Sequence, residues 1–462
     1  MPSNISIYLG SALKKSFYFA FIKISTLLCA ILVGNMMNGA SAADAPKFVI
    51  EAKKIAIPLD KDGIDTLLKK AGSAKFVLLG ESSHGTSQYY LLRTEISKRL
   101  IKEKGFNFIA IEGDWPYIYR VNQYVKGLPG AAANAKAALG TADRWPDWLW
   151  ANEEFLELVK WLRQYNDALP AEKKVGLYGI DMQDMQTSIE TALSDLEKID
   201  LTLADSLKNK YECLLEWRGD FNAYARSVAM QEKTCEQDVA TALEQFNSKY
   251  TPDNVYNSPL LFNIKQNILS VKYGEKYWRV SIQGGADGWN QRVRSMKNTI
   301  ENLSSFYEKN SSSGKGIIWA HNTHIGDARA TEMATHSAIN IGQLLRTKYG
   351  ENNIFLLGFA TYTGQVVAAR AWGAEKSVFQ IPTPPKGSVE SLLKKVKMKN
   401  FILLFNQPSY PEILLKPLGH RAIGVVYNPE VENPGNYVMT VLPYRYDALI
   451  FIEETSALNP LH

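Results

Sequence analysis

The hydrophobic and polar positions of the chain alternate between short apolar runs and longer amphipathic stretches. Phe76–Gly80 and Phe106–Ile111 are short and almost wholly apolar, which is typical of buried parallel strands. Between them, Thr86–Lys104 places apolar residues on one face at helical spacing and stops before Gly105, a residue that commonly follows a helix. The residues of this face are Leu91, Leu92, Ile96, Leu100 and Ile101. This alternation predicts an α/β fold with a mainly parallel β-sheet flanked by helices.

The same pattern continues to the end of the chain, with one long interruption. A helix is expected after Pro116, another at Asn152–Leu169, and a strand at Val175–Ile180. From roughly residue 187 to 306 strand signals almost vanish, so we expect a large all-helical insertion or subdomain there. Strands resume at four later apolar runs, namely Ile317–Ala320, Ile354–Ala360, Phe401–Phe405 and Ala448–Ile452.

The first 42 residues have the organisation of a secretory signal peptide. Lys14-Lys15 precedes the apolar stretch Ile24–Val33, and Ala40-Ser41-Ala42 then supplies small residues for cleavage. A transmembrane anchor is the alternative, but Lys23 interrupts the apolar stretch. We therefore expect an exported protein, periplasmic or secreted. Its mature chain, residues 43–462, would have no stable membrane anchor.

Composition and charge narrow the class of protein. Of the 462 residues, 46% are hydrophobic and 21% are charged, which is a globular composition rather than a disordered or multi-span membrane one. Lys and Arg exceed Asp and Glu by only five, 52 against 47, and three of these cations lie within the first 42 residues. The remaining chain is almost neutral, so its charge does not indicate a nucleic acid or a membrane surface as a partner.

Export would place the cysteines in an oxidising compartment. Cys29 leaves with the signal peptide, so that Cys213 and Cys235 are the remaining pair. They are separated by 22 residues in helix-like sequence, and either a disulfide or two free thiols fit this spacing. Two cysteines cannot make a zinc site by themselves.

The most informative feature is the set of polar residues that directly follow the predicted strands. Three of the six histidines and three carboxylates stand at four strand ends. Because the carboxyl ends of parallel strands meet at one edge of a sheet, we expect these side chains to form one site. They are Glu81 and His84, then Glu112, then Asp181, and finally His321 and His324.

Two chemistries fit such a cluster. Glu and His are ligands for zinc or manganese, and imidazoles flanked by carboxylates also serve metal-free proton transfer. The serine-hydrolase motif G-x-S-x-G is not matched, because His84 stands where the second glycine belongs. The phosphate-binding motifs G-x-x-x-x-G-K-[ST] and G-x-G-x-x-G do not occur in the sequence, and neither does H-E-x-x-H.

Several segments around these positions carry a family resemblance. They are Leu79–Thr86 with the Arg93 that follows, Ile109–Pro116, Arg144–Trp150, Tyr178–Asp181, Trp289–Arg292 and Ala320–Arg329. With these segments in this order, the chain resembles the erythromycin esterase family across nearly all of the mature sequence. The resemblance implies one hydrolase domain over residues 43–462. Five or more motifs in the right order are far more specific than any one of them.

The resemblance implies hydrolysis of a small-molecule carboxylic ester without a metal or other cofactor. In named members of the family the ester is the macrolactone of erythromycin-type antibiotics. His84 matches the family's general base, which activates water, and Arg292 matches an arginine, although Val293 stands where an aspartate is usual. Other matches are expected to surround the cleft and position water and substrate: Glu81, Arg93, Glu112, His321 and His324.

In this mechanism Glu81 or Glu112 would hold the tautomer of His84, and Arg93, Arg292 or a histidine would stabilise the oxyanion. Arg292, Trp115 and Asp181 are the expected substrate-binding residues. One alternative is a metal-dependent hydrolase of esters or peptides that uses the same cluster. Another is an exported, non-catalytic protein that binds apolar ligands in a pocket lined by aromatic side chains such as Trp115.

Overall fold

The structure is a computed structural model that describes residues 44–140, 144–230, 233–311, 313–405 and 407–462. The predicted signal peptide, residues 1–42, lies outside the described residues. Within the described ranges, no helix is both long and apolar enough to cross a membrane.

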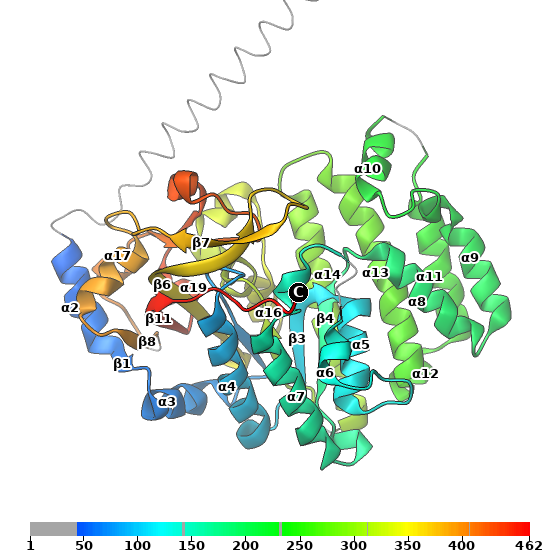
Figure 1. The fold of residues 1–462 in the computed structure, drawn as a ribbon, viewed down its shortest axis with the longest axis horizontal. Helices are drawn as coiled ribbons and strands as arrows, with labels where there is room; N and C mark the ends of the chain where they lie inside the picture. Colours follow the sequence, from blue (N-terminus) through cyan, green and yellow to red (C-terminus); the bar gives the residue numbers. More distant parts are fainter. Residues whose placement is uncertain (1–43, 141–143, 231–232, 312, 406) are drawn as a thin grey trace, which may run out of the picture.

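A nine-stranded β-sheet forms the centre of the protein (Figure 1). Six neighbouring strands run parallel. Of the other three, two pair antiparallel at one edge of the sheet, and the third pairs antiparallel with the last part of the longest strand. This arrangement confirms the predicted α/β fold with a mainly parallel sheet. The strand order is β1 (Ala56–Pro58), β8 (Asn400–Leu404), β11 (Ala448–Thr455), β6 (Ile354–Ala369), β2 (Phe76–Leu79), β5 (Gly316–Trp319), β3 (Phe108–Asp114) and β4 (Gly176–Asp181), with β7 (Lys376–Ile381) paired to β6.

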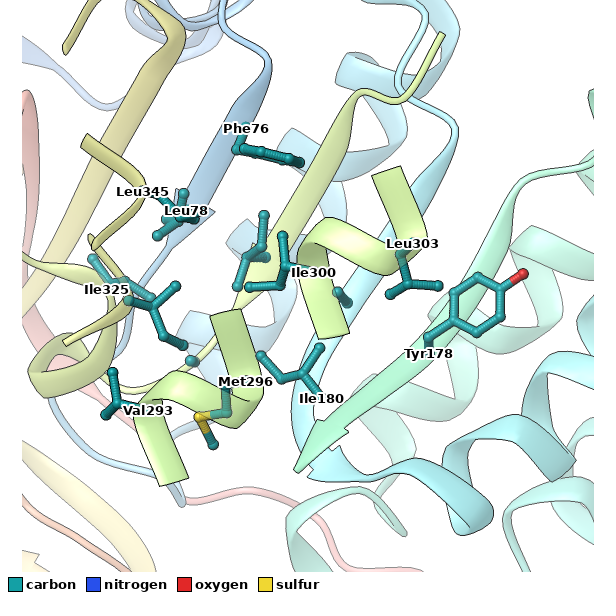
Figure 2. Packing of buried hydrophobic residues seen from close by; sticks show 14 of the residues in the cluster. Phe76, Leu78, Tyr178, Ile180, Val293, Met296, Ile300, Leu303, Ile325 and Leu345 are labelled. Atoms are coloured by element: carbon teal, nitrogen blue, oxygen red, sulfur yellow. The ribbon is translucent and has the colours of Figure 1, made fainter. Parts of the chain in front are cut away.

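Helices cover both faces of the sheet, and alternate residues of each strand point to opposite faces. In β2, Phe76 and Leu78 belong to one hydrophobic cluster, whereas Val77 and Leu79 belong to the other. Figure 2 shows the first cluster, in which α14 (Asp287–Ser311) packs on the sheet. The second cluster includes residues of α4 (Ser87–Lys104) and α7 (Glu153–Asp167), the helices on the other face.

Helix α4 differs in detail from its predicted apolar face. Leu91, which was expected on that face, is 50% exposed, while Ile96 and Leu100 are buried as expected. The charged residue Arg93 is fully buried, and its guanidinium pairs with the carboxylate of Glu81, which follows β2 in the chain. The helix ends where predicted, at Gly105 with a positive φ of 70°.

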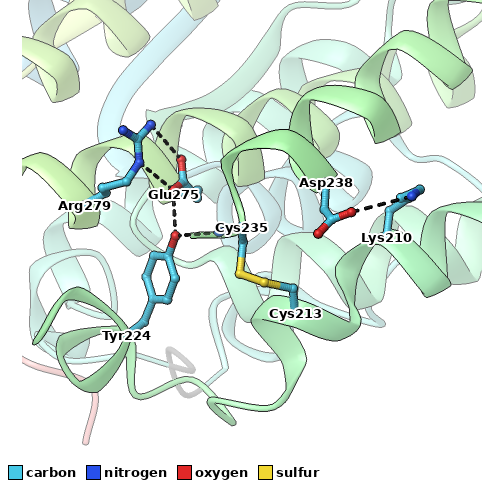
Figure 3. The surroundings of a disulfide bond; sticks show 7 residues. All are labelled: Lys210, Cys213, Tyr224, Cys235, Asp238, Glu275 and Arg279. Carbon is cyan, nitrogen blue, oxygen red and sulfur yellow. Dashed lines mark hydrogen bonds and ion pairs between the residues drawn. A yellow bond between two sulfur atoms is a disulfide. The ribbon is translucent and has the colours of Figure 1, made fainter. Parts of the chain in front are cut away.

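The stretch between β4 and β5 is helical throughout its described part and forms the green half of the molecule in Figure 1. Its helices are α8 (Met185–Glu197), α9 (Leu201–Leu215), α10 (Phe221–Ala229), α11 (Glu236–Lys249), α12 (Pro252–Asn257), α13 (Pro259–Ser281) and α14. The structure pairs Cys213 of α9 with Cys235, directly before α11, in a disulfide (Figure 3). The Tyr224 hydroxyl donates to Glu275 of α13 at 2.6 Å and accepts from the Cys235 N–H at 3.1 Å, which ties this disulfide to the long helix.

Four strands escaped the sequence prediction. β1 has three residues, and β9 (Leu418–Arg421) and β10 (Tyr437–Thr440) have four each and form a separate two-stranded sheet. So few residues do not show a clear period-two pattern. β7 has six residues, of which three are exposed, so it lacks a continuous apolar run. The remaining α-helices are α2 (Ala45–Ile55), α3 (Lys61–Ala71), α5 (Trp115–Lys126), α6 (Ala135–Leu139), α15 (Asn322–Ile325), α16 (Ile341–Tyr349), α17 (Val389–Leu393), α18 (Glu432–Gly435) and α19 (Leu442–Arg445).

Candidate active site

The carboxyl ends of four adjacent strands bring the predicted residues to one edge of the sheet. The strands β2, β5, β3 and β4 lie next to one another in the sheet, although β5 follows the other three in the chain. The segment after β2 provides two site residues, β3 and β4 each provide a carboxylate, and the turn after β5 provides two histidines. The residues are Glu81 and His84, Glu112, Asp181, and His321 and His324, and all of them are buried.

Glu81 connects His84 to a buried arginine. Glu81 Oε1 lies 2.8 Å from His84 Nδ1, and Glu81 Oε2 accepts a hydrogen bond from Arg93 Nη2 at 2.7 Å. An ionised carboxylate only accepts hydrogen bonds, so the proton of this contact is on Nδ1. His84 therefore keeps Nε2 as its free, basic nitrogen.

Arg93 does not reach the cleft, so the expectation that it stabilises an oxyanion is wrong. Its side chain is 0% exposed, and the guanidinium carbon lies 4.4 Å from the ring centroid of Tyr90 and 4.7 Å from that of Trp319. These aromatic faces hold the cation where it meets Glu81. Arg93 thus positions the carboxylate that supports His84.

The environment of His84 makes it a stronger base than a free imidazole. Burial lowers the pKa of His84, but the hydrogen bond with Glu81 and the negative charges of Glu112 and Glu81 have the larger combined effect. The net result is a pKa above the ordinary value of 6.5. His84 also lines the cleft, where a water molecule can reach it.

The two serines directly before His84 in the chain have other hydrogen-bond partners. Ser82 Oγ forms a hydrogen bond with the Tyr89 hydroxyl at 2.6 Å, and Ser83 Oγ forms one with Thr86 Oγ1. Both serines are buried, and their partners hold them away from the histidine. This arrangement differs from a serine-hydrolase triad, in which the base bonds to the nucleophilic hydroxyl.

Arg292 of α14 compensates a second group of carboxylates. Its Nη2 donates to Glu112 Oε1 at 2.9 Å and to Asp181 Oδ2 at 2.5 Å, while Nε donates to both oxygens of Asp181 at 3.0 and 3.1 Å. His324 Nε2 lies 3.1 Å from Glu112 Oε1, and its ring stacks on Trp289 with centroids 4.3 Å apart. Burial raises the pKa of Glu112, but His324 and Arg292 outweigh it and hold this pKa well below its usual range.

Arg292 thus places a guanidinium between the carboxylates of Glu112 and Asp181. Among the residues that the structure describes, no group of three or more His, Cys, Asp or Glu side chains is arranged to hold a metal ion. Asp181 was expected to bind substrate, and its oxygens instead accept hydrogen bonds from Arg292 and from the Met182 N–H. Both Asp181 and Arg292 still line the cleft.

His321 places an unpartnered N–H group close to His84. The two ring centroids are 4.8 Å apart. Nδ1 of His321 accepts from the Thr323 N–H at 3.4 Å, so a neutral ring carries its proton on Nε2. This Nε2 is buried and has no hydrogen-bond partner within the described ranges. Burial and the neighbouring His84 hold the pKa of His321 well below its usual value, and the ring is therefore a neutral donor.

A cleft of about 240 Å³ opens over His84. Its lining includes charged side chains, among them Glu112, Asp181 and Arg292. It also includes apolar side chains, namely Leu149, Trp150, Trp372 and Val425. Such a combination suits a ligand with one polar reacting group on a larger apolar body. Trp372 is 62% exposed and packs against Trp145 at a centroid distance of 4.6 Å, so the aromatic wall continues to the protein surface.

Trp115, expected to bind substrate, lies in the hydrophobic core instead. It is 1% exposed, stacks on Tyr119 and Tyr178, and donates its indole N–H to Asn263 Oδ1 at 2.9 Å. As the first residue of α5 it contacts the helical stretch through Asn263 of α13, away from the cleft. A different tryptophan, Trp150 of the Arg144–Trp150 segment, lines the cleft.

The sequence analysis did not identify two further carboxylates that line the cleft, Asp114 and Asp184. Asp114 Oδ2 accepts from Arg144 Nε at 2.8 Å, and Asp114 Oδ1 accepts from the N–H groups of Gln183 and Asp184. Burial and the negative charge of Asp114 raise the pKa of Asp184 to about 6. Asp114 and Arg144 lie within motifs quoted above, which is the signal that could have identified them. Tyr277, which also lines the cleft, stands in no motif.

An α/β sheet that presents a carboxylate-supported histidine to a cleft at its carboxyl edge is an arrangement that suits acid–base chemistry. Residues 101–455 match the erythromycin esterase family, and the chain belongs to this family, which confirms the predicted resemblance. Erythromycin esterase type II from Escherichia coli is 23% identical over 369 residues, covering 74% of this chain and 84% of that protein. Membership of the family supports hydrolase activity.

Solved structures show the same fold. The crystal structure of a succinoglycan biosynthesis protein matches with a TM-score of 0.70 and 19% sequence identity, covering 90% of this chain and 98% of that one. An erythromycin esterase variant in its open conformation matches with a TM-score of 0.58 and 15% identity, covering 86% of this chain and 95% of that one.

Proposed function

We propose that the protein hydrolyses a carboxylic ester by means of a water molecule that His84 activates without a metal ion. The observation that carries this proposal is the linear arrangement Arg93–Glu81–His84. It fixes the proton of His84 on Nδ1 and leaves Nε2 as a base in the cleft. An imidazole with this support is suited to take a proton from water.

Each step of the reaction has a group in the site. His84 Nε2 accepts a proton from water as the water oxygen bonds to the ester carbonyl carbon, and Glu81 stabilises the imidazolium that forms. The carbonyl oxygen gains negative charge, and the unpartnered Nε2–H of His321 is the donor that we assign to it. When the tetrahedral intermediate breaks down, His84 returns the proton to the departing alkoxide, and the products are a carboxylic acid and an alcohol.

Macrolide lactones are the first ester class that we propose as substrates. The name of the Escherichia coli relative supports this choice, and so does the apolar wall formed by Leu149, Trp150 and Trp372. A cleft of about 240 Å³ is smaller than the ~300–1,000 Å³ of sites that enclose drug-sized ligands. We therefore expect the ester group and its near surroundings to enter the cleft, while the rest of a large lactone lies against Trp372.

Mass spectrometry of a panel of macrolides and simple esters after incubation with purified protein tests the proposed function. Hydrolysis adds one water to a lactone and splits an open-chain ester into acid and alcohol. Intact recovery of every compound, together with measurable binding, would favour an exported binding protein instead. Prior dialysis against a chelator separates the metal-dependent alternative, because our proposal expects full activity after dialysis.

A further inference from the structure

A second buried histidine–glutamate pair lies behind the site, outside the lining of the cleft. His420 of β9 and Glu390 of α17 are both 0% exposed, with His420 Nδ1 2.7 Å from Glu390 Oε1. Glu390 Oε1 also accepts from the Arg421 N–H at 2.9 Å. Burial raises the pKa of Glu390, but the hydrogen bond with His420 and the charge of Arg421 together bring it below its ordinary value. Glu390 is therefore ionised.

The ionised Glu390 fixes the tautomer of His420. A carboxylate accepts only, so His420 carries a proton on Nδ1. Burial lowers the pKa of His420 more than Glu390 raises it, which keeps the ring neutral. Nε2 is consequently an acceptor, and it lies 3.3 Å from the side-chain nitrogen of Asn322, an N–H donor.

The side chain of Asn322 continues the sheet beyond the end of β2. Backbone pairing of this segment with β6 ends where the Gly80 N–H donates to Leu357 O at 2.8 Å. From there, Asn322 Nδ2 donates to Phe359 O at 2.8 Å and Oδ1 accepts from the Phe359 N–H at 3.3 Å, as a strand backbone would. A Cβ atom on Gly80 would fall 2.1 Å from Asn322 Oδ1, so glycine is needed for the amide to fit.

Asn322 also connects the segment that carries Glu81 and His84 with the turn that carries His321 and His324. Its N–H donates to Glu81 O at 2.8 Å, and it stands directly after His321 in the turn that carries His324. Its side-chain NH₂ has two donors, and both are in use, on Phe359 O and on His420 Nε2. The orientation of this amide thus connects His420 with the placement of His321 beside His84.

We propose that His420 is a positioning residue for ester hydrolysis. Through its acceptor nitrogen it orients the Asn322 amide, and it thereby holds His321 and His324 against the Glu81–His84 segment. The proposal rests on the proposed function, because turnover is its main measurement. Displacing a catalytic group by about 1 Å can cost about 100-fold in rate. We therefore expect loss of the contact to lower kcat by about 10- to 100-fold and to change KM little.

Two substitutions separate the two nitrogens of His420. The amide of His420→Asn reaches the position of Nδ1, so it keeps a donor for Glu390 but has no atom near Asn322. His420→Gln extends to the position of Nε2 and retains an acceptor there. Tyr446→Phe is a control of similar burial, since the Tyr446 ring lies 5.9 Å from that of His420 and its hydroxyl has no hydrogen-bond partner among the described residues.

The expected result is a kcat reduced by about 10- to 100-fold in His420→Asn, with kcat within about threefold of the wild type in His420→Gln and Tyr446→Phe. Equal kcat in His420→Asn and His420→Gln would overturn the proposal, whatever their thermal stability. If the wild type hydrolyses no ester, the proposed function fails, and imidazole ¹⁵N spectra then test the positioning separately. His420→Asn should shift the His321 signals and His420→Gln should not; identical shifts in the two variants would overturn it.

Discussion

The hydrogen bond between Arg93 and Glu81 offers a demanding test of how the site is supported. The substitution Arg93→Met keeps a long unbranched side chain between Tyr90 and Trp319 but removes the cation. Both partners of the ion pair are almost completely buried, at 0% and 2% side-chain exposure, so solvent cannot screen the charge that is left behind. The change therefore leaves Glu81 as an uncompensated buried carboxylate.

The expected loss of stability is large for a single substitution. Removing one partner of a buried ion pair costs about 3–5 kcal/mol of the free energy of unfolding, compared with about 5–15 kcal/mol for a typical domain. Arg99→Met is the matched control on the same helix. Arg99 pairs with Asp65 and Glu103 near the surface, where such pairs contribute about 0–1 kcal/mol.

Arg93→Met should also lower the activity of the protein that remains folded. Without the guanidinium, Glu81 loses the hydrogen bond that orients its carboxylate toward His84. We expect kcat to fall by roughly 10- to 100-fold in the folded variant. Chemical denaturation and the kinetics of ester hydrolysis measure the two effects. The reasoning is refuted if Arg93→Met loses less than about 1 kcal/mol and retains the wild-type kcat.

Three further predictions concern ionisation, the disulfide and metal dependence. In the folded protein the pKa of Asp184 is raised from 3.8 to about 6, so its charge lowers stability above that pH and this penalty vanishes below pH 3.8. Asp184→Asn should therefore raise stability at pH 7 by about 1–2 kcal/mol and have no such effect near pH 3.5 in thermal melts; a gain that does not depend on pH would contradict this origin. Replacing Cys213 and Cys235 by serine opens a loop with a sequence separation of 22 and should cost about 3 kcal/mol in denaturant unfolding, whereas an unchanged midpoint would show that the bridge adds nothing. The value of kcat/KM should rise with pH through an apparent pKa above 6.5, because His84 must be neutral to act as a base and its pKa is raised. The same pH profile should be measured before and after chelator treatment. An acid limb below 6.5 or a loss of activity with chelator would contradict the account.

The sequence predicted the location of the site because the edge of a parallel sheet brings strand ends together. Glu81, Glu112 and His321 follow different strands, and no knowledge of strand order was needed to expect them at one edge. The order itself was not predictable, since β5 enters between β2 and β3 after a long helical stretch. Local apolar patterns do not record which strands become neighbours.

Side-chain directions were the main source of error. Trp115 belongs to a motif of the family, yet its place at the start of α5 turns it toward Asn263 and into the core. Leu91 fits an apolar helical face, but in α4 the charged Arg93 is buried and Leu91 is exposed to solvent. Tyr277 enters the cleft from the helical stretch, and only tertiary packing determines that contact.

The most direct test of the central claim is the rate of ester hydrolysis by His84→Asn compared with the wild type, on any ester to which the wild type adds water. The account predicts that kcat/KM falls by about 100- to 10,000-fold, since the proposed general base is removed, while the thermal midpoint stays close to that of the wild type. Near-normal hydrolysis by folded His84→Asn would contradict the claim that His84 activates the attacking water.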